Sequence, residues 1–161
     1  MRAVVLETYG GPEALTIREV PDPEPGPDEV LVDVVATALN RADLLQTMGL
    51  YPDPFPSGDH EIPGMEFSGR VAAVGARVRD AAVGDDVMGI VAGGAYAERL
   101  VTHARQVVPV PSTVSLADAA AIPEVWITAW DALVLQGGLR PGDVALVHAG
   151  ASGVGAWAGR P

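Results

Sequence analysis

Short apolar runs separated by Gly and Pro dominate the first part of the chain. Within these runs apolar and polar residues alternate, which is typical of strands with one face on a core. The segments with this pattern are Arg2–Leu6, Leu15–Val20, Glu29–Thr37, Glu66–Val74, Asp86–Val91, Ala95–Thr102 and Gln106–Pro109. This part of the sequence therefore predicts a β-rich domain.

One segment among these strands has helical character. Over Asn40–Met48 the side chains of Leu44, Leu45 and Met48 fall on one side of a helix, and Gly49 ends it. Proline removes a backbone donor, so the proline-rich stretches on either side are predicted loops. These stretches are Pro21–Pro27 and Tyr51–Gly64.

The pattern changes near Ser115. A sequence that resembles a helix capping box begins there and precedes an Ala-rich helix, which Pro123 interrupts. Val125–Leu135 is a second helical run, and Val144–Val147 is a short, wholly apolar segment. Such segments are typical of strands buried on both faces in parallel α/β sheets. A β-rich module therefore leads into the opening of a doubly wound fold.

A glycine-rich turn follows this apolar segment. Its sequence, Gly150-Ala151-Ser152-Gly153-Val154-Gly155, has the spacing G-x-x-G-x-G. Glycines at such a turn let backbone N–H groups approach a pyrophosphate at a helix N-terminus. An ordinary tight strand-to-helix turn is the alternative, and the position after an apolar strand favours nucleotide binding. Gly159 and Pro161 oppose a long helix there, so we expect an incomplete nucleotide-binding region.

Composition limits the classes of protein. The chain has 161 residues, of which 48% are hydrophobic and 19% charged, enough for one sizeable domain and the start of another. Every apolar run is shorter than the roughly 18 residues of a membrane span, and no secretory signal precedes Glu7, so we expect a cytoplasmic protein. A net charge of −11 argues against binding to nucleic acid or to anionic membranes.

The residue inventory also limits metal chemistry. The chain contains no Cys, which excludes disulfides and cysteine-ligated zinc. His60, His103 and His148 lack the spacing of metal ligands, and we interpret them as surface or strand-end residues. The sequence therefore predicts no metal site.

Several motifs follow one another at characteristic spacing. They are Gly10–Glu13, Ala38–Leu44, Pro63–Gly69, Gly84–Val87, Ala119–Ala129 and His148–Gly155. Together they resemble the zeta-crystallin-like quinone oxidoreductases, a zinc-free branch of the medium-chain dehydrogenase/reductases. The resemblance implies a mainly β chain with some α structure. A GroES-like β-barrel catalytic domain would occupy residues 1–122, and the first helix, strand and glycine loop of a truncated Rossmann domain residues 123–161.

The resemblance also implies the chemistry. Zinc-containing relatives carry a Cys just before the segment equivalent to Asn40–Asp43 and a His at the position of Met65, and this chain has neither. Met65 and Glu66 alone would form a poor zinc site. The implied reaction is zinc-free hydride transfer from NADPH, or alternatively NADH, to a quinone or enone.

Substrate-side roles follow from the same resemblance. Asn40 and Tyr51 match positions that contact substrate or the nicotinamide ribose, and Asp43 matches a residue that orients them. Each has a structural alternative: a helix N-cap for Asn40, a first-turn acid for Asp43 and packing on Pro52 for Tyr51. The sequence leaves these alternatives open.

On the cofactor side, Thr128 matches a residue near the nicotinamide. The other residues predicted to bind cofactor are Gly150, Ser152, Gly153, Val154 and Gly155. Thr128 alternatively bonds to the carbonyl four residues earlier in its helix, and Ser152 alternatively caps the next helix.

Three functions remain open at this point. The first is an NAD(P)H:quinone oxidoreductase that is a homodimer when intact, with the chain as given inactive because its second domain is incomplete. The second is an enoyl-thioester reductase of the same superfamily. The third is a non-catalytic GroES-like module, for which the melting temperature would not change at high NADPH concentration.

Overall fold

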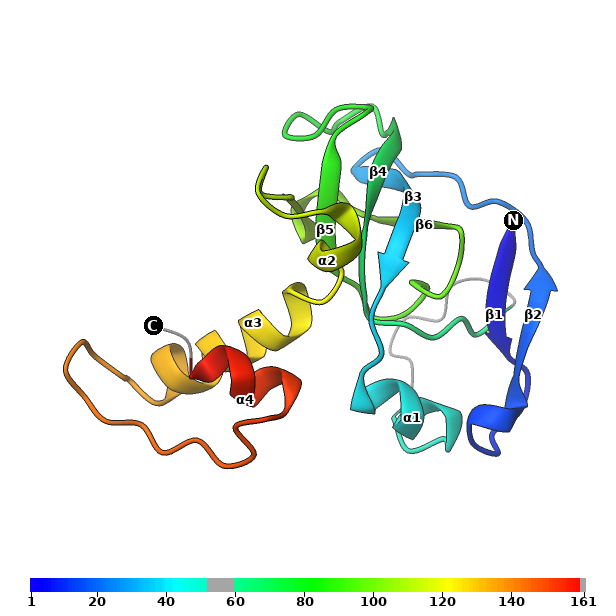
Figure 1. Cartoon of the computed structure of the whole chain (residues 1–161). Coiled ribbons are helices and arrows are strands. Elements are labelled where there is room, and N and C mark those ends of the chain that lie inside the picture. Colours follow the sequence, from blue (N-terminus) through cyan, green and yellow to red (C-terminus); the bar gives the residue numbers. More distant parts are fainter. Residues whose placement is uncertain (52–59, 160–161) are drawn as a thin grey trace. The chain divides into compact units, whose positions relative to one another are not determined.

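The computed structural model describes residues 1–51 and 60–159 (Figure 1). The chain divides into two units, Met1–Ala121 and Ile122–Pro161. The first contains all the described strands, and the second is helical. The predicted mainly β first domain is confirmed, whereas the second unit has helices but no strand among the described residues.

A five-stranded antiparallel sheet is the centre of the first unit, in the order β6-β3-β4-β5-β7 (Figure 1). Burial alternates along the first part of β3, as expected for a strand with one face on a core. The strands are β3 (Glu29–Thr37), β4 (Glu66–Val74), β5 (Asp86–Ile90), β6 (Arg99–His103) and β7 (Val107–Pro109).

The main hydrophobic core packs on this sheet. Its residues come from β3, β4, β5 and β6 and from the segment between β5 and β6, so the core joins parts of the chain that are distant in sequence. The buried members are Val30, Val32, Phe67, Val71, Val87, Val91, Ala95 and Leu100. Phe67 on β4 is completely buried and is the largest of them.

A separate hairpin lies beside this sheet. Strands β1 (Arg2–Leu6) and β2 (Leu15–Glu19) pair along their whole length, with the 3₁₀ helix η1 (Pro12–Ala14) between them. The hairpin joins the rest of the unit through backbone contacts, among them a bond from the Val4 N–H to the Tyr96 carbonyl at 2.8 Å.

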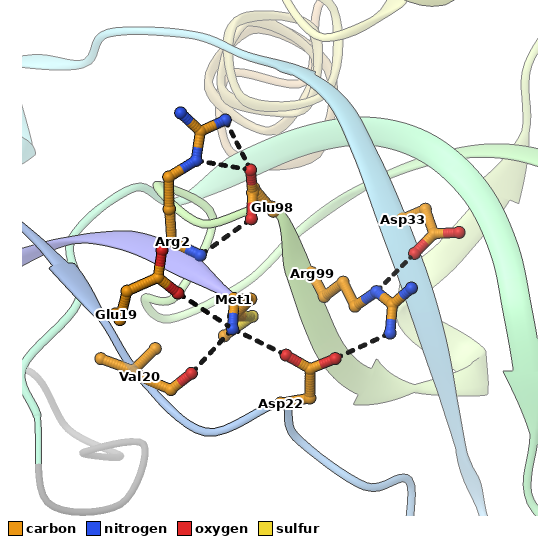
Figure 2. A network of polar contacts seen from close by, with 8 residues as sticks. All are labelled: Met1, Arg2, Glu19, Val20, Asp22, Asp33, Glu98 and Arg99. Atoms are coloured by element: carbon orange, nitrogen blue, oxygen red, sulfur yellow. Dashed lines mark hydrogen bonds and ion pairs between the residues drawn. The ribbon is translucent and has the colours of Figure 1, made fainter.

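Charged groups on the surface also connect the hairpin to the sheet (Figure 2). The Asp22 carboxylate accepts a hydrogen bond from the Met1 ammonium at 2.8 Å and forms an ion pair with Arg99 at 2.8 Å. Arg99 also pairs with Asp33 on β3. The hydrogen bond from the ammonium, followed by the nearby positive charges, lowers the pKa of Asp22. Because the Asp22, Asp33 and Arg99 side chains are about half exposed, these ion pairs contribute little to stability.

Strand β6 begins later than predicted. The sequence predicts a strand over Ala95–Thr102, whereas β6 spans Arg99–His103. Tyr96 and Ala97 turn away from the sheet and contact the backbone of β1 instead. The other predicted strands of this unit differ from the observed ones by at most one residue at an end.

Helix α1 (Arg41–Thr47) is present, but it turns a different side inward than its apolar residues suggest. Asp43, Gln46 and Thr47 are buried, while Leu44 and Met48 are half exposed. A polar side can face inward only if its groups find partners, and the next subsection shows that they do.

Short helices complete the first unit. η2 (Ala104–Gln106) connects β6 to β7, and α2 (Leu116–Ala119) follows β7. The Ser115 hydroxyl caps α2 by accepting the Asp118 N–H at 3.1 Å, so the predicted cap is confirmed. The Ser68 hydroxyl on β4 donates to the Leu116 carbonyl, which ties α2 to the sheet.

The second unit begins with α3 (Pro123–Trp130) and the π-helix η3 (Asp131–Gln136), which together contain the predicted helical run. α4 (Gly153–Ala158) packs beside α3 (Figure 1). The predicted strand Val144–Val147 has no paired neighbour among the described residues, and Val144 is 96% exposed. A strand needs a second strand for its N–H and C=O groups, and no described segment of this unit supplies one.

Within the described ranges, no helix has the length and apolar character that a membrane span requires.

Candidate functional site

Asn40 and Asp43 lie at the start of α1 and contact each other. Asn40 is the N-cap residue, and its backbone N–H donates to Asp43 Oδ2 at 2.7 Å. The two residues form a capping box, so the structural alternative for each is realised. The same geometry fixes Asn40 and Asp43 relative to each other, as a binding site also requires.

Glu66 binds the side-chain amide of Asn40. It lies at the start of β4, is only 1% exposed, and accepts a hydrogen bond from Asn40 Nδ2 at 2.8 Å through Oε1. The Thr37 hydroxyl donates to the Glu66 carbonyl at 2.7 Å and joins the ends of β3 and β4 there. Because the amide nitrogen faces Glu66, the orientation of the carboxamide is set. No described residue accepts the second hydrogen on Nδ2.

Tyr96 is the third contact of this cluster. Its hydroxyl donates to Asp43 Oδ2 at 2.7 Å. Burial of the phenol, together with the hydrogen bond to the Asp43 carboxylate, raises the pKa of Tyr96. The described structure therefore joins four side chains around the start of α1: Asn40, Asp43, Glu66 and Tyr96.

The other polar side chains on the buried side of α1 also have hydrogen-bond partners. Gln46 Nε2 donates to Glu61 Oε1 at 2.9 Å, and the Thr47 hydroxyl donates to the Leu44 carbonyl at 2.8 Å. These bonds explain why polar rather than apolar residues of α1 are buried. The half-exposed side chains of Leu44 and Met48 consequently offer an apolar surface on the outer side of α1.

Glu66 and Tyr96 are site residues that sequence reasoning missed. The sequence presents Glu66 as one half of a poor zinc site beside Met65, and nothing in it shows that the side chain is buried against Asn40. Tyr96 lies in a segment predicted as strand, where its contact with a helix far earlier in the chain is not visible.

An open apolar groove adjoins this cluster in the first unit. It has a volume of about 550 Å³ and lies between the β1–β2 hairpin and the end of β3. Tyr96 is one of the residues that line the groove, and its hydroxyl reaches Asp43. Other residues around the groove include Leu15, Ile17, Val35, Thr37 and Leu39.

Tyr51 is not joined to this cluster by any contact among the described residues. It is 42% exposed and follows the last turn after α1. Its suggested packing on Pro52 lies outside the described residues. The role of Tyr51 therefore stays a prediction.

In the second unit, the predicted cofactor residues make local contacts. Ser152 Oγ caps α4 by accepting the Gly155 N–H at 3.1 Å. The Thr128 hydroxyl donates to the Glu124 side chain at 3.0 Å, not to the carbonyl that the sequence suggested. A Cβ on Gly155 would lie 2.3 Å from the Ala149 carbonyl oxygen, so this glycine permits close packing within the loop.

The loop nevertheless keeps donors that an anion can use. The backbone N–H groups of Gly153 and Val154 open α4 and have no acceptor among the described residues. A Cβ on Gly150 would meet nothing closer than 4.0 Å. The loop therefore offers two backbone donors at the start of α4 and an open position at Gly150.

The histidines make no metal cluster in the described part of the chain. His60, His103 and His148 are all exposed there. The described residues contain no group of three or more His, Cys, Asp or Glu side chains placed to hold a metal ion.

The raised pKa of Tyr96 predicts a stability effect at alkaline pH. Unfolded tyrosine titrates near pH 10.0, and the folded state binds this proton more tightly. The stabilisation is thus complete below pH 10.0 and is lost as the pH rises towards the folded-state pKa. We expect Tyr96→Phe to flatten the fall in the unfolding free energy above that pH, measured by urea unfolding across the alkaline range. An equally steep fall in both proteins would contradict this.

Comparison with known proteins gives a consistent result. Residues 26–112 match the model of the alcohol dehydrogenase GroES-like domain. The chain is 38% identical over 159 residues to the synaptic vesicle membrane protein VAT-1 homolog of Rattus norvegicus. It superimposes with a TM-score of 0.89 on a quinone oxidoreductase of Pseudomonas syringae pv. Tomato DC3000, at 35% identity, and with 0.87 on the CurK enoyl reductase, at 30% identity.

These matches cover nearly all of this chain but only part of each relative. The chain spans 38% of the rat protein's length, 48% of the Pseudomonas chain and 49% of the CurK chain. From this chain's side, the coverage is 96% for the rat protein and 98% for both structures.

Proposed function

The chain belongs to the alcohol dehydrogenase GroES-like domain family of the medium-chain dehydrogenase/reductase superfamily, and from this premise we propose that it is part of a zinc-free NAD(P)H-dependent quinone oxidoreductase. Hydride transfer to a quinone or enone places negative charge on the substrate oxygen. A catalyst for that step needs a fixed hydrogen-bond donor for this oxygen.

The amide of Asn40 is the observation that carries this proposal. Glu66 holds the amide nitrogen, Asp43 holds the backbone of the same residue, and the second Nδ2 hydrogen has no acceptor among the described residues. A donor that is already oriented loses little freedom when the substrate binds. We assign Asn40 the contact with the substrate oxygen or the nicotinamide ribose. Tyr51 is a second such contact, and Asp43 orients Asn40.

NADPH, with NADH as the alternative, supplies the hydride when bound. We propose that the N–H groups of Gly153 and Val154 hold the pyrophosphate, with Ser152 and the open position at Gly150 beside it. Gly155 shapes the loop, and Thr128 lies on the nicotinamide side. The free donors at the start of α4 support this assignment.

The side chains of Met65 and Glu66 favour a reaction without zinc. Glu66 is the acid next to Met65, and it already accepts the Asn40 amide. The chain offers no Cys beside it. Polar groups rather than a Lewis acid would then stabilise the developing charge.

We predict that the isolated chain binds NADPH weakly through the glycine loop and does not turn over. The strongly exposed side chains of Val144 and Leu146, which have no neighbouring strand in the described part of the chain, support this expectation. The test is an NMR titration of the labelled chain with NADPH, together with an assay of quinone reduction. Amide signals of residues 150–155 should shift saturably while NADPH oxidation stays undetectable.

Variants make this titration specific. Gly150→Val places a side chain in the space reserved for the phosphate and should weaken the loop shifts several-fold. Leu135→Ala, at an exposed position in the same unit, is the control and should bind like the parent chain. Absence of loop shifts at millimolar NADPH would overturn the cofactor assignment and favour the non-catalytic module.

An enoyl-thioester reductase is the second candidate, because the CurK enoyl reductase matches at a TM-score of 0.87. Both functions place an oxygen at the Asn40 amide, so that amide can discriminate between them. The side-chain NH₂ signals of Asn40 can be followed during titration with benzoquinone and, separately, with crotonyl-pantetheine. The substrate that shifts them at lower concentration identifies the class.

Partners and location complete the proposal. We propose a cytoplasmic enzyme whose only non-protein partners are a small quinone or enone and the cofactor. The net charge of −11 is the reason for excluding nucleic acid. The intact enzyme would be a homodimer.

A further inference from the structure

The hydroxyl of Tyr96 links two parts of the first unit that are far apart in sequence. Tyr96 lies in the turn before β6, whereas both its acceptors lie at the start of α1. The nearer acceptor is Asp43 Oδ2 at 2.7 Å, and the other is the Ala38 carbonyl at 3.4 Å. Because a carboxylate and a carbonyl both only accept, the phenol must act as the donor.

The position of Tyr96 is itself fixed. Its backbone N–H donates to the Pro63 carbonyl at 2.9 Å, and its carbonyl accepts the Val4 N–H at 2.8 Å. Its ring packs so closely on Gly64 that a Cβ there would lie 2.4 Å from the ring. The hydroxyl therefore approaches α1 from a rigid support.

Asp43 connects Tyr96 to Asn40 through hydrogen bonds. The same oxygen, Oδ2, accepts both the Tyr96 hydroxyl and the Asn40 backbone N–H, each at 2.7 Å. The Asp43 carboxylate is only 6% exposed, so water does not readily replace either donor. If the Tyr96 hydroxyl is removed, the carboxylate keeps the Asn40 bond but loses the contact that limits its rotation.

We propose that Tyr96 is a positioning residue: it holds the Asp43 carboxylate, which in turn holds the Asn40 backbone N–H and so sets where the Asn40 side chain begins. The inference rests on the proposed function for its purpose, because that function uses the Asn40 amide as the substrate-facing donor. Tyr96 touches neither substrate nor cofactor in this scheme. Its contribution is to fix the starting geometry of a group that acts directly.

A single residue reports on this arrangement. Asn40 is the only asparagine of the chain, so selective labelling of asparagine gives one backbone amide and one side-chain NH₂ pair in the NMR spectrum. Tyr96→Phe keeps the ring on Gly64 and removes only the hydroxyl. We expect it to shift both Asn40 signals and to speed hydrogen exchange of the backbone amide roughly two- to tenfold, the usual effect of one hydrogen bond.

Tyr9→Phe is the matched control. Tyr9 is exposed, and its hydroxyl reaches Glu61 at 3.4 Å without contacting Asn40 or Asp43. This variant should leave the Asn40 signals unchanged. A folded Tyr96→Phe protein with unchanged Asn40 signals and exchange would overturn the proposal.

A second variant tests the same link from the other side. Asp43→Ala, chosen over asparagine so that Asn40 remains the only labelled residue, should shift the Asn40 signals further. Adding Tyr96→Phe to it should then have no additional effect, because the hydroxyl acts through Asp43. Additive shifts in the double variant would contradict the proposal.

These measurements are separate from the test of function. They use the chain without cofactor or substrate, so they report on Tyr96 even if no quinone binds. Where benzoquinone does shift the Asn40 NH₂ signals of the parent chain, Tyr96→Phe should require a several-fold higher concentration for the same shift. Loss of the quinone effect in both proteins would count against the proposed function and not against the positioning role.

Discussion

Replacing Phe67 by alanine is expected to lower the free energy of unfolding of the first unit by about 3–5 kcal/mol. Phe67 is completely buried at the centre of the sheet, among core residues from several strands. Removing the ring loses its burial and leaves a cavity that a sheet of paired strands cannot close. Urea unfolding followed by far-UV circular dichroism measures the change.

Ile17→Ala is the control for this substitution. Ile17 is a large apolar residue on β2 that is mostly exposed, so its truncation should change the unfolding free energy by no more than about 0.5 kcal/mol. A loss below about 1 kcal/mol for Phe67→Ala would show that the core packs differently from the arrangement described.

Gly64→Ala should be the second most damaging substitution, costing about 2–5 kcal/mol. Gly64 has φ +96°, a region that costs a residue with a Cβ about 1–2 kcal/mol. The added Cβ would also lie 2.4 Å from the Tyr96 ring and 2.8 Å from its backbone nitrogen. Overpacking of this kind typically adds about 1–3 kcal/mol.

Gly84→Ala separates the two causes. Gly84 has nearly the same backbone angle, φ +97°, but nothing lies within 4 Å of the Cβ position. Gly84→Ala should therefore lower the free energy of unfolding only by the cost of the backbone angle, about 1–2 kcal/mol, in the same urea experiment. Equal losses in the two alanine variants would mean that Tyr96 does not pack on Gly64.

The strands were the most predictable part of the fold. Alternation along Glu29–Thr37 and Glu66–Val74 reflects a sheet with one face on a core, and both predicted ranges agree with the structure to the residue. The start of β6 was less predictable because no Gly or Pro separates Ala95–Glu98 from the strand that follows. The partner of this segment is strand β1 of the distant hairpin, which no local pattern reveals.

The candidate site was predictable only in part. Asn40 and Asp43 have a capping pattern that is visible within one helical turn, and the contact between them is present. The buried side of α1 was not predictable from its apolar residues, because Asp43 finds a donor in Tyr96 and Gln46 finds an acceptor in Glu61, both outside the helix. Tyr96 reaches Asp43 across 53 positions, and such a contact depends on the completed fold.

The aromatic residues divide cleanly between the two units, and this division has a practical use. All three tyrosines lie in the first unit, whereas all three tryptophans lie in the second, where the rings of Trp126 and Trp130 stack with centroids 5.6 Å apart. Tryptophan fluorescence therefore reads out the second unit, and tyrosine absorbance the first, without any introduced label. Recording both through one melting curve shows directly whether the two units unfold together or in succession.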